Sequence, residues 1–189
     1  MGQRQTTDAE LMRLYASGDQ ASFGRLYERH RGPVYRYFRR QLPPEEADDC
    51  FQVLWLKLID HAPRYRPSGE FRHYLFTLAH NVLMDHYRRS RRRVEASADE
   101  PASDEDLAME LVDGAPGPDG LLAEAELRER LLALIGRLPF HQREAWLLRH
   151  EAELSPEAIA AITGTSLEGI RSRLRYAARK LKSGLMRHV

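Results

Sequence analysis

Apolar residues recur at three- and four-residue steps along most of this sequence, which is the period of an amphipathic α-helix. The clearest example is FRHYLFTLAHNVLMDHYRRSRRR, residues 71–93, in which Leu75, Leu78, Ala79 and Val82 share one face. No segment shows the alternation of apolar and polar residues that is typical of a half-buried strand. The pattern therefore predicts an all-α fold.

Four of the predicted helices lie in the first half of the sequence. A capping-box pattern at residues 7–10 opens a short helix. A longer helix starts at about Asp19, and Gly32-Pro33 predicts a kink or an interruption within it. Two more helices follow, and the second of them is the stretch described above. We expect these four helices to enclose one core and to form a first domain at residues 5–93.

The last third of the sequence predicts a second helical domain, at residues 121–187. Leucines at helical spacing begin it, and SPEAIAAITGTSLEGIRSRLRYAARKL, residues 155–181, has the spacing of a helix-turn-helix. Gly164 would supply the left-handed turn residue, and Ile162 would pack on Ile170 across the turn. The prediction is two small helical domains, a four-helix N-terminal domain and a helix-turn-helix C-terminal domain.

Composition separates these two domains. Residues 94–120 are rich in Glu, Asp, Ala, Ser, Pro and Gly, and such a segment buries too little apolar surface to offset its chain entropy. The formal net charge of +1 also hides a segregation of charge, because every charged residue is acidic from Val94 to Leu127 and basic from Arg171 to Val189. We therefore expect a flexible acidic linker between surfaces that bind polyanions.

Two basic clusters are candidate nucleic-acid surfaces. Five arginines between Arg88 and Arg93 end the 71–93 helix with no acidic residue among them, and guanidinium groups bind phosphates. The final helix carries a second set, beginning at Arg171. Each cluster has a plainer interpretation: the first is also consistent with a core helix that has a solvated basic tail, and the second with a helical hairpin that has a solvated basic face.

Other kinds of chemistry find little support. His73 and His80 share a helix face, but no third ligand lies near them at metal spacing, so we expect packing or surface histidines and neither a metal nor a cofactor. The single cysteine, Cys50, lacks a basic neighbour and is expected to be a buried, inert thiol. No apolar run approaches the ~18 residues of a membrane span, and the N-terminus lacks a signal-peptide core. These observations predict a cytoplasmic protein with no membrane insertion and no enzymatic activity.

Three blocks of this sequence together resemble a bacterial RNA polymerase sigma factor of the extracytoplasmic-function (ECF, group 4) type, in the sigma-70 family. EADDCFQVLWLKL, residues 46–58, resembles the family's polymerase-clamp helix, and residues 71–92 resemble the helix that binds the −10 promoter element. Residues 138–181 are similar to the domain that binds the −35 element. The resemblance implies a protein that binds core RNA polymerase, recognises both elements, assists promoter melting and so directs promoter-specific initiation.

The same resemblance assigns residues to these roles. Those implied for the −10 element are Tyr65, Arg66, Phe71, Tyr74, Asn81, Asp85, Arg88, Arg89 and Arg92. Those implied for the −35 element are Ser166, Glu168, Arg171, Ser172, Arg173, Arg175 and Arg179. Those implied for polymerase binding are Asp48, Asp49, Gln52, Trp55 and Leu56. The partners implied are the clamp helices of the largest polymerase subunit, the polymerase flap, promoter DNA and an anti-sigma factor, with a monomer as the free state.

The sequence departs from the family pattern at several positions. Tyr74 stands where the family usually has Trp, Thr163 where Leu is common, and Glu168-Gly169 where Gly-Thr is frequent. The last departure bears on base specificity, because those residues would lie near the DNA groove. Asn81 is also open to interpretation as an ordinary exposed helix residue, and the apolar surplus at Trp55 as part of the domain's own core.

Two other classes of function remain as alternatives. A helix-turn-helix repressor or response-regulator output module would need a dimer surface and an effector or receiver domain, neither of which is obvious here. An adaptor that sequesters a partner would function without the arginines at 171 and 175.

Overall fold

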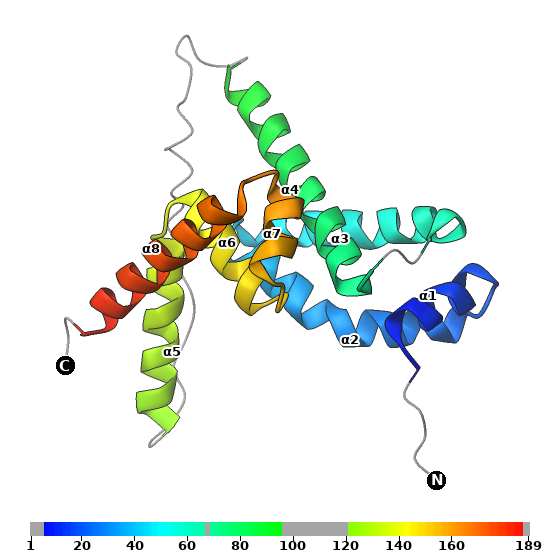
Figure 1. The fold of residues 1–189 in the computed structure, drawn as a ribbon, viewed down its shortest axis with the longest axis horizontal. Coiled ribbons are helices and arrows are strands. Elements are labelled where there is room, and N and C mark those ends of the chain that lie inside the picture. Colours follow the sequence, from blue (N-terminus) through cyan, green and yellow to red (C-terminus); the bar gives the residue numbers. More distant parts are fainter. Residues whose placement is uncertain (1–5, 67–68, 96–120, 187–189) are drawn as a thin grey trace.

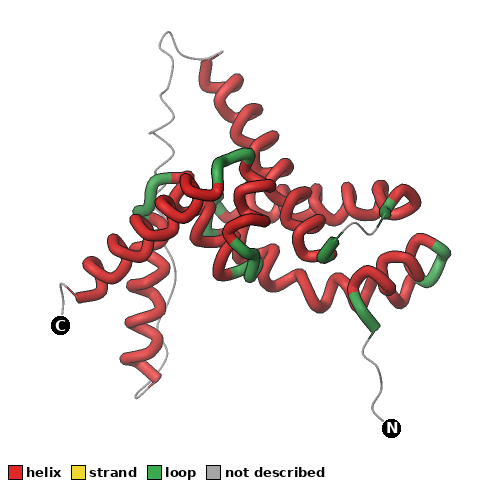
Figure 2. Tube along the Cα trace, viewed as in Figure 1, coloured by secondary structure: helices red, strands yellow, loops and turns green. Residues whose placement is uncertain are grey.

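The computed structural model describes residues 6–66, 69–95 and 121–186. This part of the chain contains helices and connecting turns and no strand, which confirms the all-α prediction (Figures 1 and 2). The elements are α1 (Asp8–Ala16), α2 (Gln20–Arg39), α3 (Pro44–His61), the 3-10 turn η1 (Ala62–Arg64), α4 (Phe71–Glu95), α5 (Leu121–Gly136), α6 (Phe140–His150), α7 (Pro156–Thr163) and α8 (Leu167–Met186). Of the predicted linker, residues 94–120, only Val94 and Glu95 are among the described residues, and they end α4.

Side-chain caps begin the first two helices where the sequence predicts. Thr7 accepts a hydrogen bond from the backbone N–H of Glu10, and the Glu10 carboxylate accepts one from the Thr7 backbone, which completes the capping box. Asp19 caps α2 through the Ala21 N–H. Helix α2 continues through Pro33, so the helix is not interrupted there. We attribute this continuity to the buried face of α2, which holds the helix on both sides of the proline.

Helices α1 to α4 enclose a shared apolar interior. Helix α2 packs on α1 and α3, and α3 packs on α4. The side chains of Leu26, Phe38, Leu54 and Leu75 are fully buried there. An ion pair between Asp8 of α1 and Arg29 of α2, 2.7 Å apart, joins the first two helices at the edge of this core. This arrangement fixes α3 and the first turns of α4 as a rigid base for the surfaces described below.

Helices α7 and α8 form a helix-turn-helix. Ser155 caps α7, and Gly164 ends it at φ 64° and ψ 21°, the left-handed conformation that favours glycine. The buried residues Ile159 and Ile170 lie on the two helices, which pack against each other. The predicted helix pair around Gly164 is therefore present.

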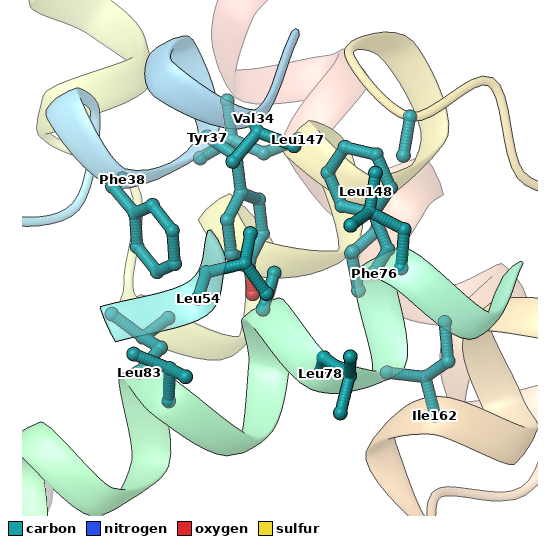
Figure 3. Close-up of a cluster of buried hydrophobic side chains, with 14 of the residues drawn as sticks. Val34, Tyr37, Phe38, Leu54, Phe76, Leu78, Leu83, Leu147, Leu148 and Ile162 are labelled. Carbon is teal, nitrogen blue, oxygen red and sulfur yellow. The ribbon is translucent and has the colours of Figure 1, made fainter. Parts of the chain in front are cut away.

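The two groups of helices also pack against each other, which the sequence did not predict. Helix α4 packs on α7, and one continuous cluster of buried residues includes side chains from both groups. Figure 3 shows Val34 and Phe76 of the first group beside Leu147 and Leu148 of the second. Residues far apart in sequence thus share a core.

Candidate nucleic-acid and polymerase interfaces

Helix α8 presents a basic face to solvent. Arg171, Arg175 and Arg179 are exposed and lie four residues apart, so they follow one face of the helix. The Arg171 guanidinium is 3.5 Å from the Glu157 carboxylate of α7, but both side chains are about 60% exposed and such a pair is weak. The guanidinium of Arg179 lies 4.9 Å from the centre of the Tyr176 ring. These cations are available to a phosphate backbone.

The start of α8 explains one departure from the family pattern. A Cβ atom at Gly169 would lie 2.8 Å from Cγ2 of Thr165 and 3.1 Å from Oγ of Ser166, so a larger residue would force those side chains to move. Ser166 and Glu168 are exposed in this turn, and Ser166 Oγ accepts a hydrogen bond from the Gly169 N–H. Arg173 donates to Thr165 Oγ1 at 3.1 Å. Glycine at 169 thus fits the hydroxyl side chains before it.

Of the remaining residues predicted for the −35 element, Ser172 and Arg173 are only partly exposed. The other members of that set are exposed on α8 or in the turn that precedes it. The structure therefore brings the whole predicted set together on one helix and its entry turn.

The second half of α4 carries the other basic surface. Arg88, Arg89 and Arg92 are exposed, and so is Asn81 two to three turns earlier. Asp85 lies between them and is 2.5 Å from Arg88 and 3.3 Å from Lys57 of α3. Arg89 Nε also donates to the Asp85 carbonyl oxygen. The arginines therefore point outward along α4 instead of folding into the core.

Three aromatic residues predicted for the −10 element form one cluster. The Tyr65 ring lies 5.1 Å from Tyr74 and 6.1 Å from Phe71 between ring centres. Tyr65 and Phe71 are buried, at 8% and 3% exposed, whereas Tyr74 is partly exposed. Desolvation by burial is the main cause that raises the pKa of the Tyr65 and Tyr74 phenols above their ordinary value. Tyr74 and the neighbouring exposed Arg66 offer contacts at the surface, while Tyr65 and Phe71 support them from beneath.

The residues of α3 that were predicted to bind polymerase also divide into exposed and buried side chains. Asp48, Asp49 and Gln52 are exposed, and the Leu56 residue is 60% exposed although it is apolar. Trp55 differs from the expectation of a contact residue, because it is only 6% exposed. The structure favours the alternative that Trp55 completes the core.

The aromatic neighbours of Trp55 account for its burial. Its ring centre lies 4.9 Å from that of Tyr27 and 6.0 Å from those of Phe23 and Phe51. The indole therefore belongs to an aromatic cluster between α2 and α3.

Contacts between the two helical groups involve residues to which sequence reasoning gave no functional role, although it expected His80 to be a packing or surface histidine. His80 Nδ1 is 2.7 Å from Glu144 Oε1, and Arg36 Nε is 2.6 Å from Glu151 Oε2. These partners are 64 and 115 residues apart, so no local spacing signals them. These contacts therefore form only in the folded chain.

Two negative observations hold for the described ranges. No three or more His, Cys, Asp or Glu side chains gather there in a way that would hold a metal ion. None of the described helices combines the length and the apolar character that crossing a membrane requires.

A helix-turn-helix with an outward arginine face, joined to a second helical module that ends in exposed arginines, defines a DNA-binding protein of the transcription apparatus. Two family models match the chain, sigma-70 region 2 over residues 26–93 and sigma-70 region 4 over residues 128–181. Together they cover more than half of the sequence. The chain belongs to the sigma-70 family, with relatives of the ECF type, and it directs promoter-specific transcription initiation as a sigma factor.

Curated relatives extend this match beyond the two regions. The chain is 28% identical over 177 residues to the RNA polymerase sigma factor CnrH of Cupriavidus metallidurans, which is 93% of each chain. It is 29% identical over 178 residues to the ECF sigma-E factor of Escherichia coli K12, which is 90% of each. Over 182 residues it is 30% identical to the ECF sigma factor SigE of Mycolicibacterium smegmatis, covering 92% of this chain and 66% of SigE.

Two solved structures share the fold. CnrH in complex with the cytosolic domain of CnrY has a TM-score of 0.64 at 24% identity, over 96% of this chain and 99% of that one. The sigma factor RpoE of Bartonella quintana in complex with the anti-sigma factor NepR has a TM-score of 0.66 at 20% identity, over 86% and 96% of the two chains.

Proposed function

We propose that residues 5–93 bind core polymerase and the −10 element, that residues 121–187 bind the −35 element, and that residues 94–120 link these two domains. The observation that carries this proposal is the pair of exposed arginine faces, one on the second half of α4 and one on α8. Each face belongs to a separate helical module, as two separated DNA elements require.

The α8 face supports a role in major-groove binding. The second helix of a helix-turn-helix enters the groove with its N-terminal residues at the base edges. Arg171 and Arg175 would then reach bases or the first phosphates, and Arg179 would bind the backbone further along. Ser166, Glu168, Ser172 and Arg173 would surround this entry, and Glu168 would accept a hydrogen bond from a cytosine amino group.

The α4 surface supports a role in binding melted DNA. Arg88, Arg89 and Arg92 would neutralise backbone phosphates, while Asn81 would bond to a base edge. A base flipped from the opened duplex costs a few kcal/mol of stacking, which stacking on Tyr74 offsets. Arg66 lies next to this cluster, which Tyr65 and Phe71 hold in place. The Asp85 carboxylate would itself repel phosphate, so its role in this proposal is to orient the Arg88 guanidinium, with which it forms an ion pair.

The exposed stripe of α3 supports docking on polymerase. Leu56 is an exposed apolar side chain on the same helix as the polar residues Gln52, Asp49 and Asp48. An apolar group with a polar rim is typical of protein interfaces. We assign this stripe to the clamp helices of the largest subunit, with Trp55 as its internal support, and the helix-turn-helix module to the flap.

The remaining features of the proposal concern the protein's setting. We infer a cytoplasmic, monomeric protein that works without catalysis or cofactor and that an anti-sigma factor controls. The fold that it shares with two sigma factors solved in complexes, one with CnrY and one with NepR, is consistent with such control.

Run-off transcription with core polymerase tests the function. The purified protein should direct initiation from specific genomic fragments, and Arg171→Ala with Arg175→Ala should abolish it on promoters that depend on the −35 element. Arg25→Ala is the control, because Arg25 is an exposed cation on α2 that belongs to neither set of predicted DNA-binding residues.

The outcomes separate the alternatives. Failure to initiate specifically on any genomic fragment would reject the sigma-factor assignment. A dimer that shifts duplex DNA without polymerase would indicate a repressor. Full function of the Arg171/Arg175 double variant would indicate an adaptor.

A further inference from the structure

The aromatic cluster proposed for base capture packs on elements that α1 holds in place. Helix α1 packs on α2 and on η1, the turn that leads into Tyr65 (Figure 1). Leu11 and Met12 of α1 are fully buried in the shared core, which fixes this helix. Since Tyr65 follows a turn and Phe71 begins a helix, the positions of their rings depend on the groups that pack against them.

A carboxylate at the start of α1 orients a buried histidine of α2. Asp8 Oδ2 lies 2.7 Å from His30 Nε2, and Asp8 Oδ1 accepts a hydrogen bond from Arg29 at 2.7 Å. The bond to His30 is the first cause that lowers the pKa of Asp8, so this carboxylate is ionised at neutral pH. An ionised carboxylate only accepts hydrogen bonds, so His30 Nε2 carries a proton and the orientation of its ring is fixed.

The oriented ring of His30 lies against the aromatic cluster. His30 is 2% exposed, and its ring centre is 5.4 Å from that of Phe71. The Phe71 ring centre in turn lies 6.3 Å from that of Tyr74. A series of ring contacts thus connects His30 to Tyr74, the aromatic member of the cluster that is partly exposed.

Charges on α1 also act on the second tyrosine of the cluster. Desolvation by burial is the first cause that raises the pKa of Tyr65; the charge of Asp8 raises it further and the charge of Arg13 lowers it. Charges have such an effect only where they lie near the phenol. The Tyr65 N–H donates to the Ala62 carbonyl oxygen of η1 at 3.1 Å, so the backbone of Tyr65 is held by the turn on which α1 packs.

The two kinds of contact with melted DNA differ in how precisely they must be positioned. A base that leaves its stack regains the lost energy only where an aromatic ring meets its face. The attraction between a guanidinium and a phosphate falls off slowly with distance, so it tolerates a small displacement. A small shift of the Tyr74 ring should therefore weaken the contribution of the bases and spare that of the phosphates.

We propose that the Asp8–His30 pair is a positioning element for base capture, which fixes the Tyr74 ring through Phe71. The inference rests on the proposed function of the aromatic cluster, and it gives α1 a part in DNA recognition without direct contact with DNA. The plainer interpretation is a buried histidine whose hydrogen bond only stabilises the fold. That interpretation predicts an effect on stability and none on how bases are recognised.

Binding of single-stranded DNA to the full chain separates these interpretations. One probe is a short fluorescent strand of random sequence, and the other is the same sugar-phosphate backbone with abasic sites. The ratio of the two affinities measures the contribution of the bases, and one stacked base should make it about tenfold. Tyr74→Ala should remove most of this ratio. Asp8→Asn should lower it about threefold or more, because asparagine offers one acceptor atom to the two donors at this site.

Asp19→Asn is the matched control for this variant. It removes the same charge at the start of the neighbouring helix, where asparagine caps as well as aspartate does, so it should leave the ratio unchanged. If Asp8→Asn is unfolded by circular dichroism, Arg29→Gln replaces it. Arg29 holds the second Asp8 oxygen, and its side chain is 32% exposed, so its loss should lower the ratio in the folded protein. Arg25→Gln is then the control.

Hydrogen exchange followed by mass spectrometry locates the change. Asp8→Asn should speed exchange at residues 62–66 and 71–75 and leave residues 50–58 of α3 as in the parent protein. Faster exchange at all three segments, a ratio that Tyr74→Ala lowers and Asp8→Asn does not, or an equal loss in Asp19→Asn would each overturn the positioning role. A ratio near one in the parent protein would overturn it together with the role of the aromatic cluster. None of these measurements uses polymerase or a promoter, so run-off transcription remains a separate test of the sigma-factor function.

Discussion

The turn glycine of the helix-turn-helix offers the sharpest test of how this sequence determines its fold. Gly164 has φ 64°, and a Cβ atom built there would meet nothing within 4 Å. Replacing it by alanine therefore introduces no clash, and the whole effect is the backbone cost of a left-handed residue, about 1–2 kcal/mol. Gly24 provides a matched control, because it also has open space around it but lies inside α2 with ordinary helical geometry.

The same substitution should then have opposite effects at the two positions. Alanine is favoured over glycine within a helix by about 1 kcal/mol, so Gly24→Ala should stabilise the protein by that amount. Gly164→Ala gains back part of its cost because alanine restricts the unfolded chain, which leaves a net loss of about 1 kcal/mol. The free energies of unfolding of the two variants should thus differ by about 2 kcal/mol.

Urea unfolding followed by circular dichroism measures this difference. The midpoints should move in opposite directions with an unchanged dependence on denaturant, which would show that the unfolded surface is the same. A Gly164→Ala variant as stable as the parent protein, or two variants that shift the same way, would refute the argument that φ at the turn selects glycine.

Three further predictions concern the core, a cap and pH. Trp55→Ala should lower the free energy of unfolding by about 3–5 kcal/mol because it leaves a cavity, whereas Leu56→Ala should change it by less than about 0.5 kcal/mol and instead weaken polymerase binding in a pull-down assay. Ser155→Ala should destabilise the protein by about 1 kcal/mol in thermal unfolding, since Ser155 Oγ accepts a bond from an α7 backbone N–H. The hydrogen bond to His30 is the first cause that lowers the pKa of Asp8 below its ordinary 3.8. The ionised Asp8 therefore contributes to the free energy of unfolding in full above about pH 4, and this contribution is lost as pH falls through the lower pKa of the folded state. Acid titration of Asp8→Asn should show a smaller loss of stability in that range, and an equal loss would contradict the assignment.

Much of the local structure follows from short-range chemistry. The capping box at Thr7, the proline after Ser155 and the glycine at 164 each act within four residues, so their consequences are visible in sequence and are confirmed. The basic faces were also predictable, because the spacing of residues on a helix fixes which ones share a side.

Burial was harder to predict at positions on the boundary of a face. Trp55 and Leu56 are adjacent apolar residues, and only the aromatic rings packed from α2 decide that the first is buried and the second exposed. Similarly, the sequence shows Gly169 only as a departure from a family pattern, whereas the structure shows that Thr165 occupies the space that a side chain at 169 would need.

The sequence alone determined the helical class, the two modules, their caps and the arginine faces, because these depend on residues within one or two turns of each other. The tertiary structure alone decided that the modules meet, that Glu144 lies buried between Tyr37 and His80, and that Glu151 joins α6 to α2. Such contacts join residues up to 115 positions apart. Their energies come from desolvation and packing that exist only once distant segments are brought together, so no local pattern encodes them.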